Sequence, residues 1–138
     1  MKYSVSLCLI PLISFPVLSS DIIMQNDDSK RCLNISPVKE VSACLHSSEM
    51  EKKREYNNAY TAFIKNINLN KKDFINYDDV INGISKAKEF YDGYIRNECF
   101  AFASQLIKDS PAYQGIYSQC MINFYRQRID FYKTYDFE

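Results

Sequence analysis

Four cysteines are the residues whose number and spacing most directly indicate a chemistry in this chain. Outside the apolar N-terminal run they form an even set: Cys32, Cys44, Cys99 and Cys120. Such a set can form two disulfides or hold a metal ion such as zinc. Zinc binding would need ligands scattered along the chain, because the sequence has no Cys-x-x-Cys pair and only one histidine, His46. The cysteines therefore predict two disulfides, with no metal and no other cofactor.

The positions of the cysteines also indicate how they pair, although four cysteines allow three connectivities. Cys99 and Cys120 lie at equal distances from a turn expected at Asp109-Ser110, and such residues face each other across an antiparallel helical hairpin. Cys32 precedes an expected helix and Cys44 lies inside it, so a bond between them would fold the preceding segment against that helix. We expect the pairs Cys32–Cys44 and Cys99–Cys120, each worth about 3 kcal/mol in the chain-entropy model.

A second group of side chains could act as acids, bases or nucleophiles. His46 follows Cys44 by two residues, but a cysteine in a disulfide is not a thiolate, so we interpret His46 as a surface histidine. Glu89 and Glu98 lie about a quarter of a helix circumference apart, and we interpret them as surface or ion-paired charges. The sequence has no nucleophile elbow, phosphate loop or His-Glu-x-x-His motif. It therefore indicates a protein that is not an enzyme.

Two further pairs near the C-terminal end could bind a ligand or a partner. Arg126 and Arg128 could hold an anion such as a phosphate, but we expect them to pair with Asp or Glu of a neighbouring helix. Tyr132 and Tyr135 could form an exposed aromatic patch, while most other tyrosines are expected at the edge of the core. Both pairs are hypotheses about surface use and neither implies a reaction.

The first residues of the chain are typical of a secretory signal. One lysine, Lys2, precedes an apolar run over residues 5–18, which also contains the fifth cysteine. The run is shorter than the ~20 residues of a membrane span and contains Pro11 and Pro16. We expect residues 1–19 to be cleaved as a signal peptide, which leaves no stable membrane span and places the protein in the periplasm or outside the cell.

Charge and composition limit the partners and the fold class. Lys plus Arg and Asp plus Glu number 17 each, so the chain lacks the basic surface that nucleic-acid binding requires. We expect no nucleic-acid partner. With only three Gly and four Pro, the chain is poor in turn formers, which favours helices over a many-stranded fold.

Periodic apolar residues predict three helices that would position these side chains. The first begins at Ser36-Pro37, with the serine as cap, and spans about 37–68. The second follows a polar break at 68–73 and spans about 78–107, with Asn76 or Asp78 as its cap. The third begins after Asp109-Ser110 and spans about 111–133.

The predicted fold class is all-α, a small antiparallel helical bundle or hairpin of about three helices with two disulfides. Its domain organisation is a signal peptide at 1–19, an irregular, extended lead-in at 20–35 and a helical domain at 36–138. Cys32 joins the lead-in to that domain. A chain of 138 residues is long enough for one core.

Several segments together resemble a known family. They are the pair Cys32 and Cys44, the segment Tyr56-Asn57-Asn58-Ala59-Tyr60, the stretch from Ala87 to Asn97-Glu98-Cys99, and Ser118-Gln119-Cys120 running into Arg126-Gln127-Arg128-Ile129. Over about residues 32–130 the chain resembles the LprI-type lysozyme-inhibitor family of exported bacterial proteins. It differs at Lys88 and Tyr91, where the family usually has Gln and Trp, at Tyr125, where it has Thr, and at Tyr56, where it has Leu.

The resemblance implies a helical domain with cysteine bridges and, for the member that names the family, inhibition of lysozyme. An inhibitor of this kind must present a rigid protrusion to a cleft that holds two carboxylates in a basic surround. The longest candidate protrusion is the connection between the first two helices, and its candidate contact residues are Lys71, Lys72, Tyr77, Asp78 and Asp79. The expected partner is therefore a protein, either lysozyme or another hydrolase acting on the cell envelope. The alternative is a periplasmic interaction or immunity-type protein that neutralises another exported toxin or supports the envelope.

Overall fold

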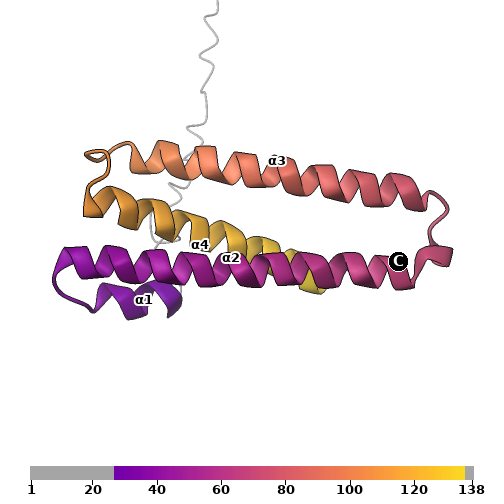
Figure 1. Cartoon of the computed structure of the whole chain (residues 1–138), viewed down its shortest axis with the longest axis horizontal. Coiled ribbons are helices and arrows are strands. Elements are labelled where there is room, and N and C mark those ends of the chain that lie inside the picture. The colour runs from indigo at the N-terminus through magenta and orange to yellow at the C-terminus, as the bar shows by residue number, and fades with distance from the viewer. Residues whose placement is uncertain (1–26, 136–138) are drawn as a thin grey trace, which may run out of the picture.

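The computed structural model describes residues 27–135, and within them every regular element is helical. A short helix, α1 (Asp27–Leu33), lies against the start of α2 (Val38–Leu69), and two further long helices follow, α3 (Tyr77–Ala103) and α4 (Pro111–Thr134). Figure 1 shows α2, α3 and α4 side by side as a bundle. This arrangement confirms the all-α bundle. The expected signal peptide and the first part of the lead-in lie outside the described residues.

The prediction of an irregular lead-in is wrong for Asp27–Leu33, which forms α1. No apolar period marks this segment, and a helix of two turns is not stable by propensity alone. Its stability comes from tertiary contact, since Cys32 is buried against Leu45 of α2 and Ile122 of α4. The spacing of apolar residues did not predict α1, because one buried cysteine supplies most of the packing of this helix.

Two predicted helix boundaries also differ from the structure. The second helix ends at Ala103 and not near 107, so Leu106 and Ile107 are exposed in the connection to α4. Pro37 is the cap residue of α2 and no side chain caps that end, so the predicted Ser36 cap is wrong. Asn76 is at the N-cap position of α3, but its side chain makes no capping hydrogen bond. The Ser110 cap of α4 is confirmed, because its Oγ accepts a hydrogen bond from the Tyr113 backbone N–H.

The core follows a seam between α2 and α4, which run parallel to each other. Three pairs of facing residues on the seam are each separated by 69 positions along the chain: Glu49 with Ser118, Tyr56 with Tyr125, and Phe63 with Tyr132. Successive pairs are seven residues apart on both helices. This is the repeat of coiled-coil packing, in which side chains of one helix enter the spaces between side chains of the other.

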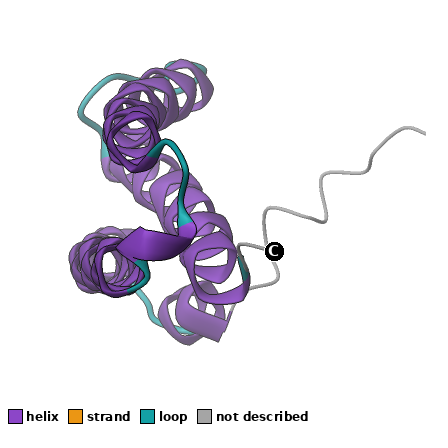
Figure 2. Cartoon of the chain, turned by 90° about the vertical axis from the view of Figure 1, so that its right-hand side faces the viewer, coloured by secondary structure: helices purple, strands orange, loops and turns teal. Residues whose placement is uncertain are grey.

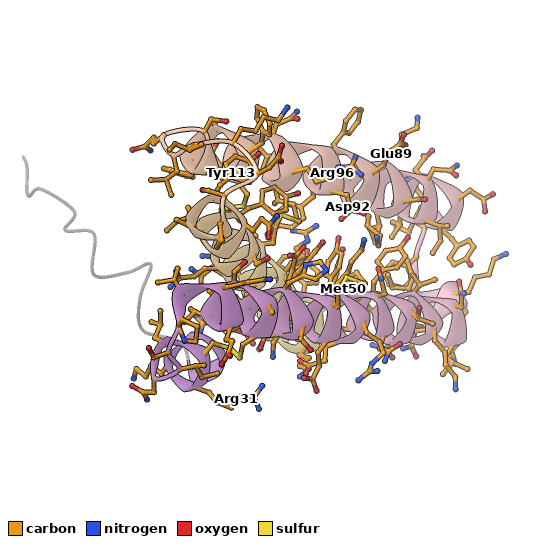
Figure 3. All side chains as sticks on the ribbon, turned by 60° about the vertical axis from the view of Figure 1, so that its left-hand side comes forward. Arg31, Met50, Glu89, Asp92, Arg96 and Tyr113 are labelled. Carbon is orange, nitrogen blue, oxygen red and sulfur yellow. A yellow bond between two sulfur atoms is a disulfide. The ribbon has the colours of Figure 1, made fainter. Side chains whose placement is uncertain are left out.

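The third long helix, α3, packs on α4 as the second half of an antiparallel hairpin. Viewed along the bundle, α2 and α3 are separate rods, and α4 runs obliquely between them (Figure 2). Side chains cross the remaining distance: the Tyr56 hydroxyl donates to Asp92 of α3 at 2.8 Å. The Lys88 ammonium, which pairs with the same carboxylate within α3, lies 4.8 Å from the centre of the Tyr56 ring. Asp92 lies on the side of α3 that faces α2 (Figure 3). The two outer helices are therefore joined through side chains and through α4.

Tyrosines supply much of the core between these helices. The rings of Tyr56 and Tyr125 stack at 5.1 Å, and burial raises the pKa of both hydroxyls above the ordinary tyrosine value. Burial also raises the pKa of Tyr91 to about 12, against a smaller opposing effect of Arg128. Tyr132 is buried in the same cluster, so the predicted exposed patch is wrong for Tyr132, while Tyr135 is exposed. The heptad position of Tyr132 on α4 explains its burial.

Candidate functional site

Both expected disulfides are present, and they lie at the same end of the bundle. The Cα atoms of Cys32 and Cys44 are 5.6 Å apart, and those of Cys99 and Cys120 are 5.5 Å apart. The first bond joins α1 to α2 and the second joins α3 to α4. All four sulfur atoms are therefore engaged, so none of these cysteines is a free nucleophile.

The opposite end of the bundle carries the predicted binding residues. The structure brings all five to the connection between α2 and α3, where they line one shallow, open depression together with three intervening residues: Lys71, Lys72, Phe74, Ile75, Asn76, Tyr77, Asp78 and Asp79. We call the segment Leu69–Asp79 the tip. It contains the short 3-10 helix η2 (Lys71–Asp73).

Contacts within the tip give it a defined shape. The Asn70 backbone N–H bonds to the carbonyls of Asn66 and Ile67, and its side chain bonds to Asn66, which ends α2. Phe74 packs against the core and so anchors the turn from below. The Tyr77 hydroxyl donates to the Asn68 side chain, and the Lys71 ammonium lies 4.3 Å from the centre of the Tyr77 ring. The tip is thus a compact turn and not an extended loop.

Two apolar residues at the tip were missed by the sequence analysis. Ile75 is 99% exposed and Leu69 is 72% exposed. Leu69 is the last residue of α2 and Ile75 lies in the turn before α3, and turn-forming neighbours dominate the sequence around both. The available signal was that neither residue fits the apolar period of the adjoining helices. An exposed isoleucine on an anchored turn is suited to enter a pocket of another protein.

Charges of both signs flank these apolar side chains. Lys71 and Lys72 lie in η2, and Asp78 and Asp79 lie in the first turn of α3. Acidic residues at a helix N-terminus are favoured by the helix dipole, so the two aspartates have a structural reason for their position. The two lysines lie in the last turn of η2, where the dipole favours cations, and Lys71 also contacts the Tyr77 ring. Their ammonium groups are the positive charges that the tip offers to a carboxylate of a partner.

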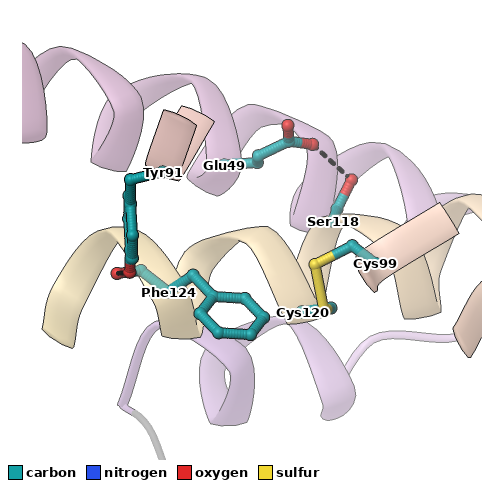
Figure 4. Close-up of a disulfide and its surroundings, with 6 residues drawn as sticks. All are labelled: Glu49, Tyr91, Cys99, Ser118, Cys120 and Phe124. Atoms are coloured by element: carbon teal, nitrogen blue, oxygen red, sulfur yellow. Dashed lines mark hydrogen bonds between the residues drawn. A yellow bond between two sulfur atoms is a disulfide. The ribbon is translucent and has the colours of Figure 1, made fainter. Parts of the chain in front are cut away.

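The other candidate side chains do not converge on a reaction centre. His46 is exposed, as expected, and its Nδ1 lies 3.5 Å from the carboxylate of Glu49. The Ser118 hydroxyl donates to the same carboxylate at 2.7 Å and is buried (Figure 4). The carboxylate thus stands between the serine and the histidine, so the histidine does not contact the serine as a base would in a catalytic triad.

Among residues 27–135, the expected pairing of the two arginines with acidic residues is not observed. Arg128 lies over the rings of Tyr91, Phe131 and Tyr132, with its guanidinium carbon 4.3–5.1 Å from their centres. Arg126 lies on the other side of α4, in a groove that also contains Glu98. The aromatic content of the core explains the difference, since a guanidinium stacks on aromatic faces as readily as it pairs with a carboxylate. Glu89 is exposed on α3.

Comparison of the chain with family models, with curated proteins and with solved structures finds no match. No helix between residues 27 and 135 combines the length and the apolar character that a membrane span needs. Over the same residues, no group of three or more His, Cys, Asp or Glu side chains is arranged to hold a metal ion.

Proposed function

We propose that this chain is an exported binding protein, similar to lysozyme inhibitors, that inserts its tip into the cleft of a hydrolase acting on the cell envelope. It acts by binding and performs no reaction. Two intramolecular disulfides support action outside the cytoplasm, since such bonds persist in oxidising compartments. The secretory leader expected from the sequence agrees with this location.

The observation that carries the proposal is the exposure of Ile75 on an anchored turn between two lysines and two aspartates. The cleft of a glycoside hydrolase holds a pair of carboxylates that flank the scissile bond. Lys71 and Lys72 offer charges complementary to that pair, while Asp78 and Asp79 complement the basic residues around it. Ile75 supplies the apolar contact at the centre, where binding energy is concentrated.

A titration of lysozyme hydrolysing cell walls tests the proposal. We expect near-stoichiometric inhibition by the chain with both disulfides formed, and inhibition weakened by roughly tenfold or more in Ile75→Asp, as for a central interface residue. The matched control is Ile107→Asp, because Ile107 is 83% exposed in the connection between α3 and α4, at the disulfide end. The control should inhibit as well as the unchanged chain. Circular dichroism checks that both variants keep the helical fold.

Different results contradict different parts of the proposal. If excess unchanged chain leaves hydrolysis unaffected, lysozyme is not the target. If Ile75→Asp and Ile107→Asp both inhibit fully, inhibition is real but the tip is not the site.

The charge of the tip favours a second candidate, an immunity-type protein that neutralises another exported toxin. Between positions 71 and 79 there are two lysines and three aspartates, so electrostatic steering does not restrict the tip to a strongly basic enzyme. Affinity capture from envelope extracts distinguishes the two candidates. A partner other than lysozyme, retained by the unchanged chain and by Ile107→Asp but lost with Ile75→Asp, supports the second candidate.

A further inference from the structure

A groove lies between α3 and α4 beside the Cys99–Cys120 disulfide, at the end of the bundle opposite the tip. Its volume is about 510 Å³. Most of its lining is apolar, and two charged side chains border it; the residues that matter here are Glu98, Phe102, Leu106, Ile116, Phe124 and Arg126. Phe124 packs next to the disulfide (Figure 4). The sequence predicted the disulfide and treated Glu98 and Arg126 as separate surface charges, but it gave no sign of the groove.

A row of exposed and half-buried side chains leads along α3 into this groove. Phe90, Tyr94, Glu98 and Phe102 follow one another at intervals of four residues, and the three aromatic residues are 73%, 52% and 43% exposed. Residues spaced by four form one of the natural ridges of a helix surface. The ridge therefore has a protruding aromatic ring at one end, Phe90, and an apolar groove at the other.

The two charges of the region lie at different levels along the hairpin. Cys99 faces Cys120, and the ring of Tyr94 contacts that of Phe124 at 5.8 Å, which fixes the antiparallel register. In this register Arg126 lies at the level of residue 93, about 8 Å along the axis from Glu98 at 1.5 Å per residue. Neither charge has an ion-pair partner among residues 27–135.

We propose that this face binds a second copy of the chain through a two-fold axis that passes between the two α3 helices at the level of residues 95 and 96. The two-fold rotation places Glu98 of each copy at the level of Arg126 of the other, so two identical ion pairs form between the copies. It also brings Phe90 of each copy to the level of Phe102 of the other, at the mouth of the groove. A two-fold interface joins the same patch on both subunits, and this patch carries both the ring and the groove.

The packing geometry is consistent with this partner. When ridges of residues spaced by four interdigitate on two helices, the helices cross at about −50°, which is the commonest class of helix packing. In a pair of identical chains, each copy must present both the acid and the base, at positions that the two-fold rotation interchanges. A partner of different sequence would not require both charges on this face. The charge pattern therefore favours a second copy over an unrelated helix.

Sedimentation equilibrium of the chain with both disulfides formed tests the proposal. We expect the mass to rise from one chain to two with increasing concentration. Glu98→Arg or Arg126→Glu alone should weaken association by roughly tenfold or more, since each change places two pairs of like charges in contact. The double variant Glu98→Arg with Arg126→Glu should restore association, because both ion pairs re-form with reversed sign. The matched control is Phe100→Glu, which replaces an exposed aromatic residue of α3 outside the ridge and should associate normally.

Three results would overturn the inference: a single chain at all concentrations up to about 1 mM, the weakest affinity considered, an association that persists in Phe90→Glu, or a double charge reversal that fails to restore it. Circular dichroism confirms that each variant is folded. The inference does not depend on the proposed function, because the tip lies at the other end of the bundle. Ile75→Asp should associate like the unchanged chain, so failure of one proposal is distinguishable from failure of the other.

Discussion

The two ends of the bundle are stabilised in different ways. At one end, two disulfides join α1 to α2 and α3 to α4. At the other end, the described residues include no cysteine, and the helices are joined by aromatic packing of Phe63, Tyr132 and Tyr135. The proposed binding residues lie at this second end, beyond the aromatic cluster.

This difference separates two demands on a small domain. Cross-links stabilise a chain mainly by reducing the freedom of its unfolded state. They can therefore stabilise the fold without determining the shape of a binding surface. Aromatic packing acts in the folded state and also fixes the direction in which the tip projects. We therefore expect the tip end to be the more sensitive to single substitutions and the disulfide end to be the more tolerant.

Truncation of Phe63 should have the largest effect. Phe63 is buried on the seam and contacts Tyr132 with ring centres 5.1 Å apart. Phe63→Ala should lower the free energy of unfolding by about 3–5 kcal/mol, the range for a buried phenylalanine. Urea denaturation measures the effect, and Phe100→Ala is the control, since Phe100 is exposed and should change stability by about 0.5 kcal/mol or less. Equal effects of the two changes would contradict the importance of the aromatic end.

Removal of a disulfide should have the next largest effect. Replacing Cys99 and Cys120 with alanine should cost about 3 kcal/mol in urea denaturation without reductant. The comparable replacement of Cys32 and Cys44 should have a more local result, because that bond holds α1 and not the hairpin. Amide hydrogen exchange should show lost protection in α1 with the seam retained. Loss of protection along all of α2 and α4 would contradict this division.

Loss of a single helix cap at the disulfide end should have the smallest effect. Ser110 Oγ accepts a hydrogen bond from the Tyr113 N–H at 3.2 Å. Ser110→Ala should lower the free energy of unfolding by about 1 kcal/mol. Ser104→Ala is a suitable control, because the Ser104 hydroxyl donates to the Phe100 carbonyl at an exposed helix end. A larger loss in the control would show that the cap does not stabilise α4.

The sequence predicted the parts of the fold that depend on local pattern. The periodic spacing of apolar residues located the three long helices. The equal distances of Cys99 and Cys120 from the turn between the last two helices identified that disulfide pair. The seam between α2 and α4 could not be predicted, because the burial of Glu49 depends on Ser118, 69 residues away. The short α1 was missed for the same reason, since its stability comes from contacts of Cys32.

The sequence predicted that the five candidate residues lie together in one connection, and the structure places them there. The charged residues of the tip identify it as a surface segment, and their grouping follows from a single short connection. The sequence signal for Ile75 was only its departure from the apolar spacing of the adjoining helices, and the path of the backbone was needed to show that its side chain projects outward. The row from Phe90 to Phe102 has a regular spacing that the sequence does contain. The sequence alone could not show that this row is a surface ridge, because that depends on which face of α3 the other helices cover.

The separation of 69 residues between seam partners has a consequence for the order of folding. Each disulfide joins residues 12 or 21 positions apart, so each can form within a short stretch of chain. The apolar face of α2, in contrast, lacks most of its cover until α4 has been synthesised. Contacts between distant residues form late, after the cost of closing a long loop. During synthesis, a nascent polypeptide that ends before α4 therefore exposes this face to chaperones, and the core assembles only after α4 has been made.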